Sequence, residues 1–136
     1  MLKKIAFSSI LLMLTILMAC SPGYSPEVQK LHDEVMEIHD EVMPEMGTIH
    51  KLKKELTKKL KNEKGNVSEE NLENNIQALE VADEFMMDWM HQFKMPKNES
   101  DKNLIKYLED QKIKITKVNG DMKTIIKNAK IANNTN

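Results

Sequence analysis

The chain has 136 residues, 30% of them charged, and a formal net charge of −1 at pH 7, a balance that excludes a general nucleic-acid binder with a strongly basic surface. All of its basic side chains are lysines, so bidentate recognition of phosphate or carboxylate by a guanidinium is excluded too. The length suits one small domain behind a short N-terminal segment.

That N-terminal segment has the features of a secretory signal peptide. Lys3 and Lys4 precede an apolar run over residues 5–18, which ends at Ala19-Cys20. The run is too short to cross a hydrocarbon core of roughly 30 Å, which needs about 20 residues. We therefore expect residues 1–19 to be cleaved from the mature chain.

The tetrad Leu17-Met18-Ala19-Cys20 resembles the lipobox of bacterial lipoproteins, although Met18 stands where a small residue is more usual. The resemblance implies that Cys20 carries a diacylglycerol and an acylated amino group. More than one acyl chain makes the attachment to membrane lipid stable. The alternative is an ordinary secretory signal that happens to end in the one cysteine of the chain.

Ser21 follows the cysteine, and the absence of aspartate there resembles the pattern of lipoproteins sent to the outer membrane. We therefore expect a lipid-anchored protein of the cell envelope, on the periplasmic face of the outer membrane. Residues 20–25 would form the lipidated cysteine and a tether, which at about 3.3–3.6 Å per residue reaches only about 20 Å. The folded domain should lie close to the bilayer.

The first predicted helix covers about residues 26–63. Ser25 provides an N-cap and Pro26 occupies the first helical position. Its apolar residues then alternate at spacings of three and four, as in a coiled coil. Pro44 should kink this helix, because it removes a backbone donor and crowds the carbonyl of Asp40.

Two further helices are predicted at about residues 68–94 and 101–132. Lys64-Gly65-Asn66 supplies the first turn, and Pro96 closes the second helix. Asn98 or Ser100 caps the third, and residues 133–136 form a frayed tail. Gln111 interrupts the apolar seam of the third helix, where it either fixes the register or lies at the edge.

An all-α, coiled-coil-like, antiparallel three-helix bundle over residues 26–132 would bury all three seams. Charge favours its first hairpin. Residues 51–64 hold seven lysines, whereas residues 69–88 hold seven acids and no lysine. A turn centred near residue 66 would bring these segments together, with residue 50 level with residue 82.

A seven-residue repeat is the most unusual feature of the first helix. His32-Asp33-Glu34-Val35-Met36 is followed by His39-Asp40-Glu41-Val42-Met43. With Met46 and His50, these histidines and methionines form one stripe beside the aliphatic seam. The second helix adds Met90 and His91, at a level that the predicted turn places nearby.

Three interpretations of this stripe remain open. Thioether and imidazole groups together suit a soft metal such as copper(I). Methionine also fills irregular gaps in helical cores, so the stripe can serve packing alone, and haem ligation is the third possibility. The candidate metal ligands are His39, Met43, Met46, His50, Met90 and His91.

Neighbouring acids of the first helix could suggest a hard-cation site. They lack the glycine turn of a calcium loop and are expected to form a solvated outward face. These acids are Asp33, Glu34, Glu37, Asp40 and Glu41. Catalysis has no sequence support, because the available serines lie at expected helix caps and no glycine-rich phosphate loop is present.

A family resemblance agrees with this outline. His39-Asp40-Glu41-Val42-Met43-Pro44-Glu45-Met46-Gly47, followed by Ile49 and Leu52-Lys53-Lys54, resembles small envelope lipoproteins of Bacteroidota-type bacteria, some of which are labelled "viral A-type inclusion protein". Met86-Met87-Asp88-Trp89-Met90 is similar to them too, so the resemblance covers roughly residues 28–93. It implies an envelope location and a helical fold, and it carries no activity, cofactor or binding residue.

We therefore expect a non-enzymatic, membrane-anchored helical module that binds another envelope protein or associates with itself. The alternative is a periplasmic copper-binding protein that uses the His and Met stripe.

Overall fold

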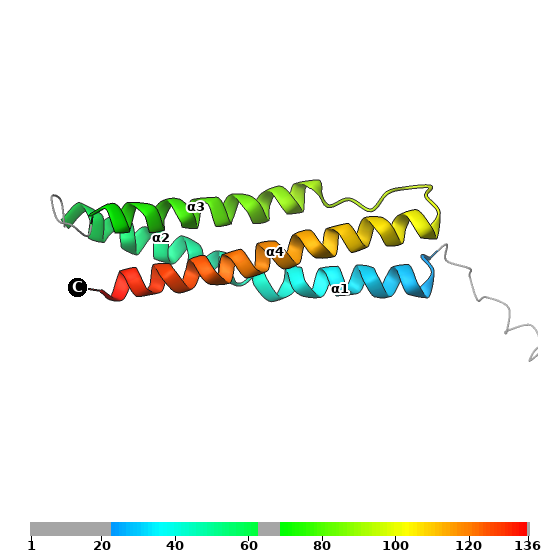
Figure 1. Ribbon diagram of the computed structural model, residues 1–136, viewed down its shortest axis with the longest axis horizontal. Helices are drawn as coiled ribbons and strands as arrows, with labels where there is room; N and C mark the ends of the chain where they lie inside the picture. The colour runs from blue at the N-terminus through cyan, green and yellow to red at the C-terminus, as the bar shows by residue number, and fades with distance from the viewer. Residues whose placement is uncertain (1–22, 63–68, 136) are drawn as a thin grey trace, which may run out of the picture.

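A computed structural model of the protein describes residues 23–62 and 69–135. Within these ranges the chain forms four helices (Figure 1): α1 Pro26–Val42, α2 Glu45–Asn62, α3 Glu69–Gln92 and α4 Asp101–Asn134. None of these helices combines the length and the apolar character needed to span a membrane. The predicted signal peptide, Cys20 and the predicted turn at residues 64–66 lie outside the described residues.

The helices form the predicted all-α bundle. α1 and α2 follow one another as a single bent helix, α3 runs back beside α2, and α4 returns along the whole length (Figure 1). α4 packs against all three other helices, and α2 also packs against α3. The antiparallel three-helix arrangement is therefore confirmed, with α1 and α2 together serving as its first helix.

Serine caps begin both α1 and α4. The backbone N–H of Val28 donates to Ser25 Oγ over 3.5 Å, and that of Asn103 donates to Ser100 Oγ over 3.4 Å. Of the two candidate caps for α4, Ser100 is thus the one used. Asn98 instead turns the chain in the left-handed region, at φ 59°, which asparagine tolerates better than most residues.

The predicted kink at Pro44 is confirmed as a bend between α1 and α2. The N–H of Met43 donates to the His39 carbonyl over 3.0 Å, and the N–H of Met46 donates to the Met43 carbonyl over 3.1 Å. Pro44 has no N–H to continue the helical pattern to Asp40. Regular α-helix therefore ends at Val42 and resumes at Glu45.

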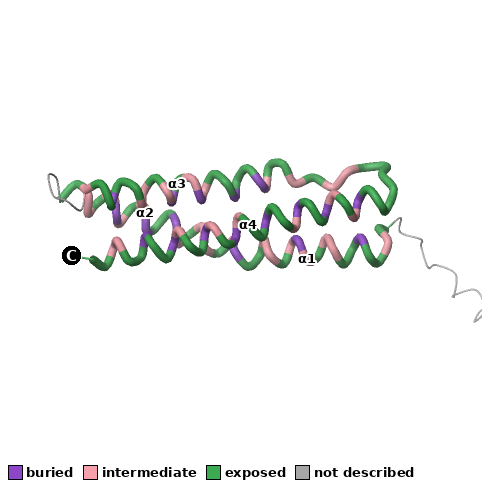
Figure 2. Tube along the Cα trace, viewed as in Figure 1, coloured by how far each residue is buried: buried purple, intermediate pink, exposed green. Residues whose placement is uncertain are grey.

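The core repeats every seven residues and continues through the bend (Figure 2). Along α1 and α2 the fully buried residues at this interval are Val28, Val35, Val42, Ile49 and Leu56. Their counterparts in α4 are Leu108, Ile115, Met122 and Ala129. Because the interval of seven is unbroken across Pro44, the bend changes the direction of the helix without rotating its buried face away from the core.

Two helix ends differ from the sequence prediction. α3 stops at Gln92 instead of residue 94, and the free N–H of Lys94 donates to the Tyr107 hydroxyl over 2.9 Å. α4 continues to Asn134, two residues into the expected frayed tail. There the Lys59 ammonium donates to the carbonyls of Ala132 and Thr135. A positive charge near the last carbonyls stabilises the C-terminal end of a helix.

Candidate functional site

His39, the first of the predicted metal ligands, packs against an aromatic ring. Its side chain is only 15% exposed, and its ring centre lies 5.6 Å from that of Trp89 on α3. Its Nδ1 lies 2.8 Å from Asp40 Oδ1. Two surfaces of this imidazole are thus already in contact with neighbouring side chains.

His50 lies at a different level of the bundle. Its side chain is 66% exposed, and its Nε2 lies 3.2 Å from Asp83 Oδ1 on α3. Eleven residues separate it from His39, which corresponds to about 16 Å along a helix. The two imidazoles therefore do not converge on a common point.

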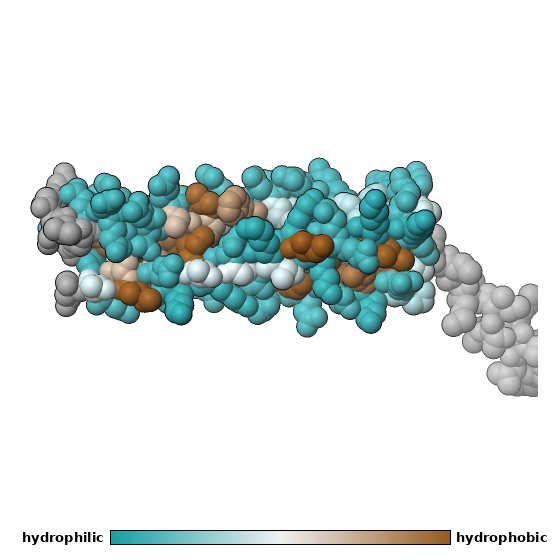
Figure 3. Space-filling view, in the orientation of Figure 1, coloured by the Kyte–Doolittle hydropathy of each residue, from teal (hydrophilic) through white to brown (hydrophobic). Residues whose placement is uncertain are grey.

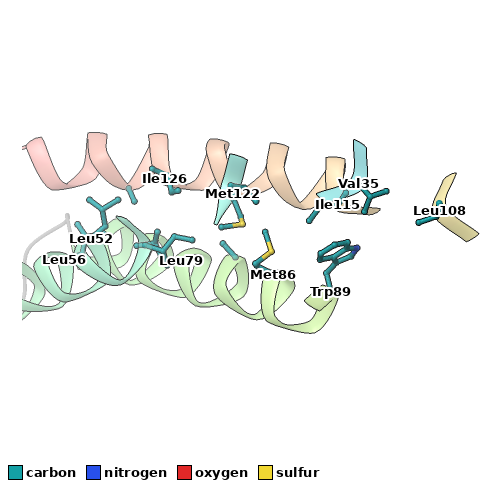
Figure 4. Packing of buried hydrophobic residues seen from close by; sticks show 14 of the residues in the cluster. Val35, Leu52, Leu56, Leu79, Met86, Trp89, Leu108, Ile115, Met122 and Ile126 are labelled. Atoms are coloured by element: carbon teal, nitrogen blue, oxygen red, sulfur yellow. The ribbon is translucent and has the colours of Figure 1, made fainter. Parts of the chain in front are cut away.

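The remaining candidates contribute mainly to packing. Met43, Met46 and Met90 are half-buried against the core, and His91 is exposed. In the described ranges, no three His, Cys, Asp or Glu side chains are placed to hold a metal ion. Figure 4 shows two other methionines, Met86 and Met122, turned into the space between α3 and α4, where thioethers fill the core.

The His-Asp-Glu-Val-Met repeat has a structural explanation. His32 and His39 contact Phe93 and Trp89 respectively, with ring centres 6.1 Å and 5.6 Å apart. Val35, in the first copy, is fully buried, as is the valine of the second copy. Equivalent positions of the two copies thus make equivalent contacts one heptad apart.

These histidines belong to an aromatic cluster where α3 ends. Trp89 and Phe93 stack at 4.8 Å, and Phe93 lies 6.2 Å from Tyr107 on α4. Aromatic pairs of this kind contribute about 0.5–1.5 kcal/mol each beyond their buried area. The spacing of four residues between Trp89 and Phe93 was the signal in the sequence for this stacked pair.

Two acids of α1 do not belong to a purely solvated face, which corrects the sequence interpretation. Glu34 Oε2 lies 2.8 Å from the Lys112 ammonium on α4. Glu41 Oε1 lies 2.6 Å from Lys123 Nζ, and Glu41 Oε2 accepts from Asn119 Nδ2 over 3.0 Å. These acids join α1 to α4.

Both carboxyl groups are stabilised in their charged form. The hydrogen bond from Lys112, with the attraction of its charge, holds the pKa of Glu34 below its usual value. Hydrogen bonds from Lys123 and then Asn119 lower the pKa of Glu41. Both pairs therefore act as ion pairs at neutral pH.

The polar contacts along α4 share one register. Lys112 with Glu34, Asn119 with Glu41 and Asn133 with Glu55 are each separated by 78 residues, as expected for parallel neighbouring helices. Asn119 is buried and supplies the polar residue within the core that fixes register in coiled coils. Gln111 is buried as well, and its Nε2 donates to Asp110 Oδ2 over 3.3 Å.

Charge alternates from helix to helix. α1 has six acids and one lysine, α2 six lysines and two acids, α3 seven acids and no lysine, and α4 eight lysines and four acids. Lys53 of α2 lies 3.2 Å from Glu80 of α3. With the contact of His50 and Asp83, this confirms the predicted hairpin register to within one residue.

Two surface hollows of the described chain are shallow grooves with basic borders. One lies along α2 and is lined by His50, Lys53, Lys54, Thr57, Lys58 and Lys61. Another lies mainly on α4 and is lined by Glu45, Lys123, Ile126, Lys127, Lys130, Ile131 and Asn134. Small-molecule sites are usually concave and mostly apolar, so these grooves suit surface contact better than an enclosed ligand.

No family model matches the chain, and neither a curated protein nor a solved structure is significantly similar to it.

Proposed function

We propose that this protein is a lipid-anchored lipoprotein of the cell envelope that acts as a non-enzymatic helical binding or scaffold module. The proposal rests on the contacts of the histidine and methionine side chains, which serve packing. The histidines of the repeat contact aromatic rings, and the buried methionines Met86 and Met122 fill the core. What remains for function is a rod of alternating acidic and basic helices.

The anchor follows from the lipobox ending at Cys20. The described chain begins at Gly23, and α1 begins at Pro26, so lipidation would hold one end of the rod near the bilayer. The resemblance of residues 28–93 to small envelope lipoproteins supports an envelope location, and Ser21 after the cysteine favours the periplasmic face of the outer membrane.

Metabolic labelling with radioactive palmitate tests the anchor. We expect the wild-type chain to incorporate label and to stay in the membrane fraction after a high-salt wash. Cys20→Ala should abolish labelling. Ser21→Ala is the matched control and should be labelled normally. Labelling that persists in Cys20→Ala would contradict the proposal.

A further inference from the structure

Methionines gather on the side of the bundle where α3 passes the bend of the first helix. Lys53 contacts Glu80, and His50 contacts Asp83, across the seam between α2 and α3. Residues seven apart occupy equivalent positions in a heptad pattern, and this pattern continues through the bend. One heptad closer to the bend, the four equivalent positions are all methionines: Met43, Met46, Met87 and Met90.

These side chains are accessible from solvent, unlike the methionines of the core. Met87 is 39% exposed, and Met43, Met46 and Met90 are half-buried. Met36, seven residues before Met43, is half-buried on the same side of α1. We call these five residues the methionine patch. Flexible thioether side chains adapt to the shape of a partner, which is typical of surfaces that bind helices.

The backbone leaves this side of the bundle open near the patch. Close backbone packing in the described chain joins α4 to the other three helices and α2 to α3, but it does not join α1 to α3. Figure 1 shows α1 and α3 on opposite sides of α4. The rings of His39 and Trp89 bridge the space between them. Side chains rather than close helix packing therefore form this surface.

Acidic side chains border the methionine patch on both helices. Asp33, Asp40 and Glu84 each precede a methionine of the patch by three residues, and all three are exposed. Residues three apart are neighbours on the surface of a helix. The border of the patch is therefore negatively charged.

These border acids are not balanced by lysines. Asp33 and Asp40 contact the histidines that precede them, and within the described ranges no lysine forms an ion pair with any of the three border acids. By contrast, Glu34 and Glu41, the acids of α1 that face α4, each contact a lysine. Because complementary charge selects interface partners, the border favours a cationic partner.

We propose that the methionine patch binds a basic amphipathic helix of a partner protein. The apolar stripe of this helix lies on the methionines, and its lysine or arginine side chains contact Asp33, Asp40 and Glu84. Helices that dock in this way present apolar residues at spacings of three and four. The patch and its border run from residue 33 to residue 46, about 20 Å along the axis, which a helix of about four turns covers.

A second copy of this chain does not supply such a helix. The exposed residues of α2 include no apolar side chain; they are Gly47, His50, Lys51, Lys54, Lys58, Lys61 and Asn62. On α4, the exposed apolar residues Ile113 and Ile131 lie five turns apart. Figure 3 shows the apolar surface over α3 and α4 as separate patches. Neither lysine-rich helix thus combines its charge with an apolar stripe.

This inference rests on the binding role proposed above and names the kind of partner. It does not require lipidation, since the patch lies within the helical bundle. The tests therefore use the mature chain carrying Cys20→Ser, which cannot be acylated at that position. Anchoring and partner binding can then fail separately.

Nuclear magnetic resonance of isotopically labelled methionine methyl groups tests the binding directly. The probe is a synthetic helix of leucine and lysine in which the leucines repeat at spacings of three and four. We expect it to shift the methyl signals of the methionine patch, whereas those of the fully buried Met86 and Met122 should stay unchanged. A peptide of the same composition in scrambled order, and the same helix with glutamate in place of lysine, should cause no shift.

Met87→Lys and Phe85→Lys form a matched pair of variants. Both add one positive charge to an exposed position of α3, but residue 85 lies about 200° around the helix from residue 87. We expect Met87→Lys to weaken binding of the leucine–lysine helix by about tenfold or more, because it places like charges together. Phe85→Lys should leave the affinity nearly unchanged, and circular dichroism should show equal helicity in both variants.

Equal weakening by Met87→Lys and Phe85→Lys, or unchanged methyl signals of the patch, would overturn the inference. So would a parent chain that is dimeric by light scattering and becomes monomeric in Met87→Lys, because a second copy would then occupy the patch. Binding of the peptide without palmitate labelling in cells would leave the inference standing and refute only the anchor.

Discussion

At the scale of single residues, Glu41 shows how an acid beside the buried face of a helix can join two helices. It accepts a hydrogen bond from the buried Asn119 and pairs with Lys123. Its neighbour Glu37 is exposed and four residues away on the same helix. The two glutamates differ because Glu41 lies against α4, whereas Glu37 is exposed.

Glu41→Gln tests this difference through pH. A carboxyl group whose pKa is lowered by folding stabilises the native state above its unfolded pKa, and this contribution is lost as the pH falls through the folded pKa. We expect Glu41→Gln to lower the urea midpoint at pH 7, and we expect the difference from wild type to shrink below pH 4.5, the ordinary value for the group. Glu37→Gln should have little effect at either pH. Equal effects of the two substitutions would contradict the assignment.

The separation of His39 and His50 leads to a prediction about copper. Because these imidazoles lie at different levels, in contact with Trp89 and Asp83, we expect only weak Cu(I) binding. Anaerobic titration against a competing chelator should give an affinity weaker than micromolar. Submicromolar binding that is lost in His39→Ala/Met43→Leu would favour the copper-binding alternative over packing.

At the scale of helices, Gly47 and Gly120 both lie in open helical positions. Glycine inside a helix is less favourable than alanine by roughly 0.5–1 kcal/mol, and a Cβ at Gly120 or Gly47 would contact no neighbouring atom. We expect Gly120→Ala, in the middle of α4, to raise the free energy of unfolding by about that amount. Gly47→Ala, in the first turn of α2, should have a smaller effect. Urea denaturation measures both effects. A loss of stability in Gly120→Ala would contradict the open position of this glycine.

The helices, the bend and the first hairpin could be predicted from the sequence because their signals are local. Apolar spacing, Pro44 and the runs of lysine and acid each act within a few turns of helix. The roles of Glu34 and Glu41 could not be predicted. The apolar periodicity shows where a residue lies relative to the buried face of its own helix, but it does not show which other helix packs beside that residue. The end of α4 was missed for a similar reason, since Lys59 reaches it from α2.

At the scale of the whole molecule, alternating charge favours the observed order of packing. Acidic α1 and α3 each pack on basic α4, and α3 also packs on basic α2, whereas the remaining contact joins the two basic helices α2 and α4. Exposed ion pairs contribute only about 0–1 kcal/mol each, so this pattern selects partners more than it supplies stability. The apolar heptads supply the stability, and charge favours the contacts between acidic and basic helices.

Small-angle X-ray scattering provides a prediction at this scale. The 34 residues of α4 give the rod a length of about 51 Å. We expect the mature chain to scatter as a rod of about this length, because the other three helices pack along α4. A maximum dimension near twice this value would contradict the side-by-side packing of the helices.

The constant separation between Glu34 and Lys112, Glu41 and Asn119, and Glu55 and Asn133 restricts how this chain can change in length during evolution. A single inserted residue in the middle of α4 would rotate everything after it by about 100° and shift it by 1.5 Å, which would break the later pairings together. Tolerated insertions and deletions should therefore come in sevens and occur at matching heights of two helices, so that the bundle lengthens or shortens by whole layers.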